Sequence, residues 1–184
     1  MSTKKVYLLL ADGFELIEAM TPVDVLRRAG VEVVTVSVAG RRMVESSNGV
    51  HLEADALPSE VDWEGGEALV LPGGYPGYEN LRKNEHVGRL GKQYLAEGKI
   101  VGAICGAPIV LQEYGIGCGR RVTGHSCIRE QMTDFDYTGQ PVERDSNLIT
   151  SIGAGHALAF SFALLEAICG SEAVEKVKPG MEIR

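Results

Sequence analysis

The sequence predicts an α/β fold, a mostly parallel sheet between two layers of helices with one β-hairpin appended. Short apolar runs alternate with longer segments of helical periodicity, which is the order of consecutive βαβ units. The short runs are apolar throughout, as is typical of strands buried on both faces of a parallel sheet. With 184 residues, the chain is expected to form one domain over residues 1–184.

The first βαβ unit is predicted from the amino-terminal residues. A strand is expected over residues 5–11, a helix over residues 17–28 that ends before Gly30, and a second strand over residues 31–38. A hairpin follows, because β-type segments flank Asn48-Gly49, a dipeptide favoured in type I′ turns.

The remaining elements follow from the same patterns. A helix should begin after the capping residue Asn84 and end at Gly98, and another should begin with Pro108 in its first turn. The helix with Pro108 is expected over residues 107–114, and further helices at 156–168 and 171–177. Further strands are expected at residues 67–71, 99–104, 121–123, 142–144 and 147–152.

Composition excludes several classes of protein. The net charge of −7 argues against nucleic-acid binding, which needs a basic surface. No apolar run approaches the ~18 residues of a membrane span, and the stretch at residues 6–11 is too short for a secretory signal. The 4 cysteines do not form a disulfide scaffold, so a reducing cytoplasm is the expected location.

Ligands of open α/β sheets bind at the carboxyl ends of the strands. Four polar or reactive side chains are predicted at that rim, namely Glu15, Glu18, Cys105 and His125. The predicted rim segments are residues 12–18, 72–77, 105–106, 124–127 and 153–155.

Cys105 is the strongest candidate nucleophile. It is the single residue between a predicted strand and a predicted helix, and Gly102 and Gly106 leave room for a sharp turn. The helix N-terminus should lower the pKa of the thiol and favour the thiolate. The alternative is a small buried core cysteine.

The other rim residues have both functional and structural interpretations. Gly73 and Gly74 can expose backbone N–H groups as an oxyanion hole or form an ordinary turn. Glu15 and Glu18 share a helical face, where one carboxyl in a crowded pocket would stay protonated beside the sulfur, although the helix dipole alone favours acidic residues there. His125 is a candidate acid–base group or a structural histidine.

The spacing of the motifs predicts no metal and no cofactor. His125 and Cys127 lie near Cys118, but without the ligand spacing of zinc sites. Neither the glycine fingerprint of dinucleotide-binding folds nor a phosphate-binding loop occurs in the chain, so nucleotide binding is unsupported.

The motifs ADGFELIE, VDVLRRAG, VLPGGYPGYENL, AICGAP, RVTGH and TSIGAG resemble, in order and spacing, the DJ-one/ThiJ/PfpI superfamily, and the DJ-one branch above all. The resemblance implies a flavodoxin-like three-layer sandwich and a homodimer. It also implies that Cys105 is the reactive cysteine, Glu18 its protonated partner and His125 the nearby histidine. Glu15 matches a second acidic position, and the implied pocket contains the backbone donors of Gly73, Gly74 and Gly106.

The preferred hypothesis from this resemblance is a glyoxalase or deglycase that consumes methylglyoxal, glyoxal or their protein and nucleotide adducts without glutathione, in protection against carbonyl and oxidative stress. The partner would be the small aldehyde or glycated substrate, with no membrane or nucleic acid. A redox sensor or chaperone that uses oxidation of Cys105 is the alternative. A cysteine peptidase-like hydrolase is weaker, because Gly106 stands where the protease-like branch has histidine.

Overall fold

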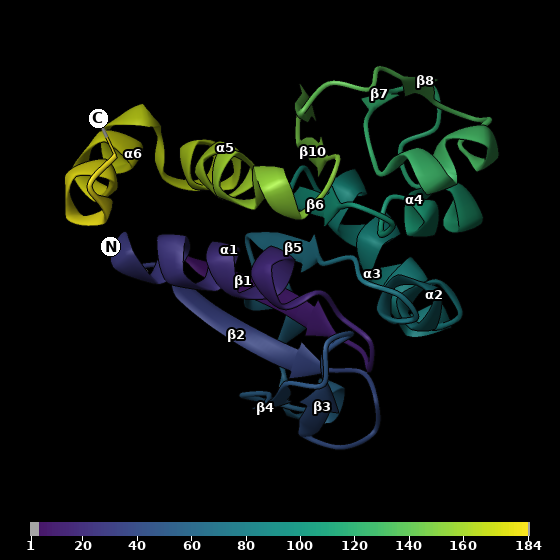
Figure 1. The fold of residues 1–184 in the computed structure, drawn as a ribbon, viewed down its shortest axis with the longest axis horizontal. Coiled ribbons are helices and arrows are strands. Elements are labelled where there is room, and N and C mark those ends of the chain that lie inside the picture. The colour runs from purple at the N-terminus through teal and green to yellow at the C-terminus, as the bar shows by residue number, and fades with distance from the viewer. Residues whose placement is uncertain (1–3, 184) are drawn as a thin grey trace.

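The computed structural model describes residues 4–183 and contains a central six-stranded sheet in the order β2-β1-β5-β6-β10-β9 (Figure 1). Five of these strands are parallel, and β9 pairs antiparallel with β10 at one edge. The strands of this sheet are β1 (Lys5–Leu10), β2 (Glu32–Ser37), β5 (Ala68–Leu71), β6 (Ile100–Ile104), β9 (Val142–Asp145) and β10 (Leu148–Ser151).

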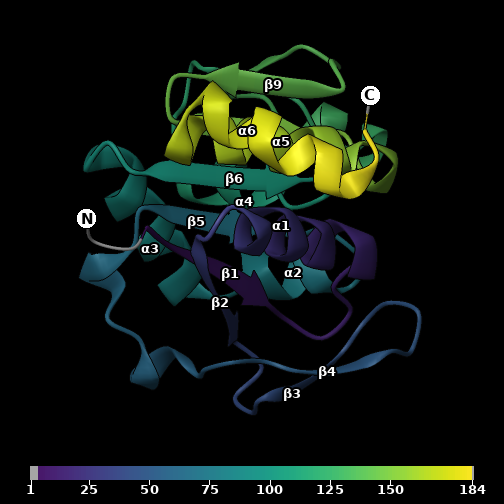
Figure 2. The ribbon, with the colours of Figure 1, turned by 90° about the vertical axis from the view of Figure 1, so that its left-hand side faces the viewer.

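Helices cover both faces of the sheet. In Figure 2, α1, α5 and α6 lie in front of the strands, whereas α2, α3 and α4 lie behind them. The helices are α1 (Leu16–Arg28), α2 (Gly77–Arg82), α3 (Glu85–Ala96), α4 (Ile109–Tyr114), α5 (Ala157–Cys169) and α6 (Ser171–Val177). The structure thus confirms the predicted α/β fold, with its mostly parallel sheet between two helical layers.

Side-chain alternation along β1 divides the core into two clusters. Val6 and Leu8 pack in the cluster beneath α1 and α5, while Tyr7 and Leu9 pack in the cluster beneath α3 and α4. All four side chains are buried, because successive residues of a strand point to opposite faces of a sheet that is covered on both sides.

The predicted hairpin forms, but its turn differs from the prediction. β3 (Met43–Glu45) pairs antiparallel with β4 (His51–Glu53), and the Ser46 N–H donates to the Val50 carbonyl at 2.8 Å. Gly49 has a positive φ of 78°, whereas Asn48 does not. A type I′ turn requires positive φ at both central residues, so the prediction of that turn type is wrong.

Three other local features differ from the sequence-based expectation or were absent from it. Residues 121–122 form β7 (Arg121–Val122), which pairs with β8 (Asp136–Tyr137) outside the main sheet. α4 begins at Ile109, with Pro108 as its N-cap residue and not within its first turn. α2 was not predicted, because its first residue is a glycine and its N-cap, Pro76, offers no capping side chain.

Short 3₁₀ helices complete the described chain at Pro58–Glu60, Trp63–Gly65, Ser126–Gln131, Ala154–His156 and Lys178–Met181. Among residues 4–183, no helix combines the length and apolar character needed to span a bilayer.

Candidate active site

Cys105 occupies a strained turn at the carboxyl end of β6. Its φ of 63° lies in the left-handed region, which non-glycine residues enter only when their surroundings hold them there. Two backbone hydrogen bonds do so, since the Cys105 N–H donates to the Ser151 carbonyl at 2.9 Å and the His125 N–H donates to the Cys105 carbonyl at 2.7 Å. The half-buried side chain is therefore fixed by β10 and by the segment after β7.

Glu18 lies in the first turn of α1, and its side chain is buried against this turn. The residue is 1% exposed, and its Oε2 accepts a hydrogen bond from the Gly73 N–H at 2.9 Å. The Ala154 N–H also donates to the carboxylate. Burial raises the pKa of Glu18 to about 7, and the nearby charge of Glu15 acts in the same direction. Glu18 is therefore only partly ionised near pH 7, unlike an exposed carboxyl.

The thiol of Cys105 is hydrogen-bonded to Glu18. Burial, followed by the charge of the Glu18 carboxylate, raises the pKa of Cys105 to about 12, although the N–H groups of Gly74 and Gly106 oppose the shift. The predicted lowering of the thiol pKa is therefore wrong for a sulfur that faces an ionised Glu18. One reason is that α4 begins only at Ile109, so the positive end of its dipole is not at Cys105 and does not offset the effect of burial on the thiol pKa.

The two groups titrate as a pair. Since the pKa of Glu18 is about 7 and that of Cys105 about 12, the pair holds one proton between these values. These values favour the proton on the sulfur. In the alternative state, with the proton on Glu18, the carboxyl donates to a thiolate that also accepts from the Gly74 and Gly106 N–H groups. That arrangement supplies a nucleophile together with a proton donor.

The three predicted glycine donors have different roles. The Gly73 N–H is already engaged by Glu18, so it is not available as an oxyanion donor. A Cβ on Gly73 would lie 2.5 Å from Glu18 Oε2 and 2.6 Å from Cys105 Cβ, which requires glycine there. Gly74 and Gly106 direct their N–H groups at the sulfur, as a donor pair should.

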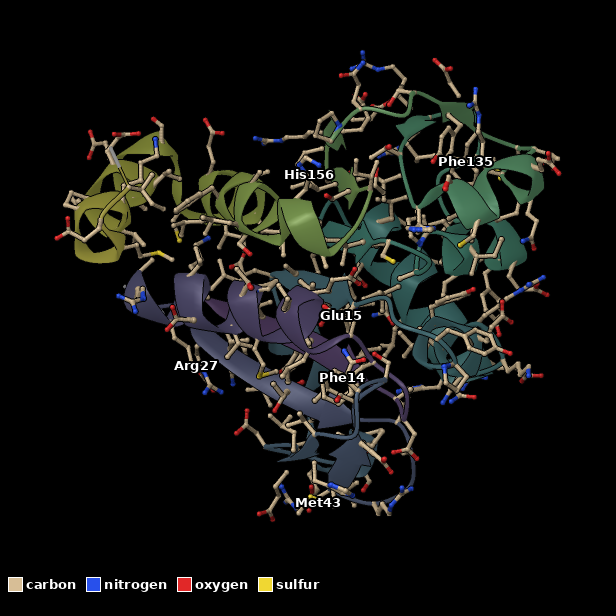
Figure 3. All side chains as sticks on the ribbon, viewed as in Figure 1. Phe14, Glu15, Arg27, Met43, Phe135 and His156 are labelled. Carbon is tan, nitrogen blue, oxygen red and sulfur yellow. The ribbon has the colours of Figure 1, made fainter. Side chains whose placement is uncertain are left out.

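Glu15 has a structural role at the start of α1. It is the N-cap residue, and its Oε2 accepts a hydrogen bond from the Glu18 N–H at 2.7 Å. Figure 3 shows Glu15 at the end of α1 that points toward the middle of the molecule. The predicted acidic pair is thus close together, but Glu15 positions Glu18 through the backbone.

His125 lies beside the pair and is exposed. Its Nδ1 accepts a hydrogen bond from the Cys127 N–H at 3.2 Å, which leaves Nε2 as the nitrogen that carries the proton of the neutral ring. A Cβ placed on Gly153 would lie 3.9 Å from His125 Cδ2 and 3.8 Å from Glu18 Oε1. Among residues 4–183, the His125 side chain makes no other hydrogen bond.

Two contributors to the site were missed in the sequence. The ring of Tyr78 covers Gly106, since a Cβ there would lie 2.4 Å from Tyr78 Cδ1, and this leaves no room for a histidine at position 106. Burial raises the pKa of Tyr78, and the nearby Cys127 acts in the same direction. The Ala154 N–H is the second, and a backbone donor of this kind has no sequence signal. Tyr78 would have been found had α2 been predicted.

The described part of the chain, residues 4–183, contains no group of three or more His, Cys, Asp or Glu side chains arranged to hold a metal ion. The residues that meet at the rim are therefore a thiol, a carboxyl, an imidazole and backbone N–H groups. This set can perform nucleophilic addition and proton transfer.

Comparison with known proteins shows the family of the chain. The DJ-1/PfpI family model matches residues 4–167. DJ-1beta of Drosophila melanogaster is 33% identical over 181 residues, covering 97% of each chain, and its crystal structure aligns with a TM-score of 0.95 at 32% identity over 100% of each chain.

Two further relatives are informative. The glutathione-independent glyoxalase DJ-1 of Schizosaccharomyces pombe is 31% identical over 178 residues, covering 91% of this chain and 93% of the relative. The structure of oxidized Toxoplasma gondii DJ-1 aligns with a TM-score of 0.92 at 33% identity, covering 98% of this chain and 99% of the other. This chain belongs to the DJ-1/PfpI family.

Proposed function

We propose that this protein is a cysteine-dependent glyoxalase that converts methylglyoxal or glyoxal to a 2-hydroxy acid without glutathione. The observation that carries the proposal is the pairing of the strained Cys105 with the buried carboxyl of Glu18, whose pKa is about 7. The glyoxalase activity named for the Schizosaccharomyces pombe relative supports the same chemistry.

The first step is addition to the aldehyde. The Cys105 thiolate forms a carbon–sulfur bond to the aldehyde carbon, and the carbonyl electron pair moves to oxygen. That oxygen takes the proton of the Glu18 carboxyl, which leaves a hemithioacetal and a Glu18 carboxylate. The N–H groups of Gly74 and Gly106, freed from the sulfur as it becomes neutral, are the nearest donors for the developing oxyanion.

The second step moves hydrogen between adjacent carbons. The Glu18 carboxylate removes the proton from the former aldehyde carbon and delivers it to the neighbouring carbon through an enediol, while the hydroxyl proton of the first carbon passes to the oxygen of the second. The first carbon is thereby oxidised to a thioester and the second is reduced to an alcohol. Water then hydrolyses the thioester, releasing lactate from methylglyoxal and restoring the thiolate. His125 is the alternative base for this proton transfer.

The test is methylglyoxal turnover without glutathione by the wild type, Cys105→Ala and Glu18→Gln. We expect Cys105→Ala to lose essentially all turnover, and Glu18→Gln to lose about 10²- to 10⁴-fold, the usual contribution of a general acid–base group. Cys118→Ala removes an exposed thiol outside the site and serves as the matched control. Full turnover by Cys105→Ala would disprove the mechanism.

The same addition chemistry extends the proposal to deglycation. A hemithioacetal or aminocarbinol adduct on a protein or nucleotide presents the same two carbons to the Cys105 thiolate. A true deglycase should release unmodified amine from a purified adduct faster than the adduct dissociates spontaneously. Release that only matches spontaneous dissociation would restrict the activity to the free aldehyde.

A redox sensor is the second candidate, favoured by the hydrogen-bond donors around the sulfur. The Glu18 carboxyl and the Gly74 and Gly106 N–H groups could each bond an oxygen of a sulfinate on Cys105. The Toxoplasma gondii relative has a structure described as oxidized, which motivates an oxidation test on this protein. Mass spectrometry after mild peroxide treatment should find two added oxygens on Cys105, and oxidation confined to other cysteines would exclude this function.

We also propose a homodimer formed through the face of α1 and α5. These helices lie on one side of the sheet in Figure 2, and they carry the exposed apolar side chains of Ile17 and Leu158, which are 54% and 37% exposed. Light scattering should report twice the chain mass of 19.7 kDa, and Ile17→Glu should lower it. A wild-type mass of one chain would exclude the dimer.

A further inference from the structure

Two tyrosines lie beside the reactive sulfur, and the proposed reaction uses neither of them. Tyr75 directly follows Gly74, and its side chain is among the large hydrophobic residues left exposed, at 71%. Tyr78 belongs to the short helix α2. Their ring centroids are 6.0 Å apart and the rings are tilted by 59°, which is a favourable aromatic geometry.

Their position relative to the sulfur follows from the backbone. The N–H groups of Gly74 and Gly106 both contact Cys105. Tyr75 is the next residue after the first donor, and the ring of Tyr78 packs on the second, where a Cβ would approach its Cε1 to 2.5 Å. The ring of Tyr78 therefore borders Gly106, the residue after Cys105, and the ring of Tyr75 borders that of Tyr78.

The two rings differ in how firmly they are held. Tyr78 is held by its packing on Gly106, where a Cβ would meet three of its ring atoms. Tyr75 contacts Tyr78 but leaves most of its surface in solvent. A firmly held ring with an exposed neighbour provides a surface on which a flat group of a bound molecule can stack.

We propose that Tyr75 and Tyr78 form an aromatic subsite that favours substrates carrying a flat, uncharged, unsaturated ring next to the reacting carbonyl. This inference rests on the proposed function, for which it names a substrate class, the aryl-substituted α-oxoaldehydes. The net charge of −7 disfavours an anionic ring, and stacking on tyrosine provides affinity without a charged partner.

The first experiment compares kcat/KM for phenylglyoxal with kcat/KM for methylglyoxal. The ratio should fall about three- to tenfold in Tyr75→Ala and in Tyr75→Leu, because leucine covers surface without stacking, whereas Tyr75→Phe should retain it. Met43→Ala is the control, since Met43 is 44% exposed on the hairpin strand β3, and Figure 3 shows it at the lower edge of the molecule, apart from Glu15.

The second experiment needs no turnover. Cys105 is alkylated with iodoacetamide or N-phenyl iodoacetamide, forming a sulfur–carbon bond as iodide leaves and the thiol proton passes to solvent. Labelling of the exposed Cys118 in the same molecule provides the internal reference. The preference of Cys105 for the phenyl reagent should fall about three- to tenfold in Tyr75→Ala and Tyr75→Leu.

The two experiments separate the two proposals. If neither glyoxal is turned over but the labelling preference depends on the ring at position 75, the aromatic subsite stands and the glyoxalase proposal fails. If the labelling preference is the same in the wild type, Tyr75→Ala and Tyr75→Leu, the subsite is overturned, whatever the turnover.

Discussion

The polar side chains at the two ends of the parallel sheet differ in their hydrogen-bond partners. At the amino end, the hydroxyls of Tyr7 and Tyr94 donate to the backbone carbonyls of Asp62 and Trp63, each at 2.6 Å. At the carboxyl end, Glu18 and Cys105 are bonded to each other and to backbone N–H groups. The two tyrosine hydroxyls are thus satisfied at the amino end, although the buried Nε2 of His86, which packs on Trp63, has no hydrogen-bond partner among the described residues. The carboxyl end holds a titratable pair, a thiol and a carboxyl, in a crowded turn.

The largest expected effect is that of a single methyl group at the carboxyl end. In Gly73→Ala the Cβ would meet Glu18 Oε2 at 2.5 Å and the Ile104 carbonyl oxygen at 3.0 Å, so we expect a loss of about 3 kcal/mol in the free energy of unfolding and loss of turnover. At the amino end, Gly98→Ala meets no atom within 4 Å but keeps a φ of +76°, and it should cost only about 1 kcal/mol. Urea denaturation measures both, and equal costs would contradict the comparison.

The next effect is the pH dependence of stability. The pKa of Glu18 rises from 4.5 to about 7 on folding, so the native protein holds more protons than the unfolded chain between these values. Its contribution is full below pH 4.5 and is lost as the pH rises through 7. Glu18→Gln should therefore be more stable than the wild type at high pH by about 2 kcal/mol, relative to their difference at low pH.

Unfolding by urea at about pH 5 and about pH 8 measures this difference. Glu67→Gln is the control at the amino end, where Glu67 pairs with Lys4 at 3.3 Å and both side chains are close to half exposed. A stability difference between wild type and Glu18→Gln that does not change with pH would show that Glu18 does not carry the shifted proton.

A smaller effect is expected for a neutral hydrogen bond at the amino end. Tyr94→Phe removes the donor to the Trp63 carbonyl but keeps the buried ring, so we expect a loss of about 1 kcal/mol and unchanged turnover. Parallel measurements of unfolding and methylglyoxal consumption test this separation. A large loss of turnover in Tyr94→Phe would show that the two ends are coupled.

The smallest effect belongs to the exposed ion pair between Lys4 and Glu67. Lys4→Met should lower the free energy of unfolding by less than about 0.5 kcal/mol, because water and salt screen the pair. The difference should vanish in about 1 M salt. A loss above about 1 kcal/mol that persists in salt would show that this ion pair at the amino end of the sheet contributes more to stability than a screened surface pair should.

Local patterns were sufficient to predict much of the fold. The strand predicted over residues 147–152 is present as Leu148–Ser151, and the apolar helix predicted over residues 156–168, ending at Gly170, is present as Ala157–Cys169. The helix α2 could not be predicted, because tertiary contacts and not a capping residue support it. The type I′ turn was wrong because Asn-Gly fits more than one hairpin geometry.

The candidate site likewise contains features that local sequence patterns predict and features that depend on tertiary contacts. Cys105 and Glu18 are recognisable by residue type and placement, whereas the state of their proton depends on burial. The hydrogen bond between the Gly73 N–H and Glu18 joins residues 55 apart in sequence, and no local pattern reports it. The thiol pKa was mispredicted for this reason, because a helix N-terminus is visible in the sequence and desolvation is not.

The dependence of Cys105 on Ser151 has a consequence for the newly synthesised chain. The carbonyl that fixes the Cys105 backbone and the Ala154 N–H that bonds Glu18 come from the last strand of the sheet and the turn after it. A chain emerging from the ribosome thus carries an ordinary thiol until its final quarter has docked. The paired state of this sulfur therefore forms only after residues 151 to 154 have folded against it. Its reactivity is an indicator that folding of the carboxyl-terminal part is complete.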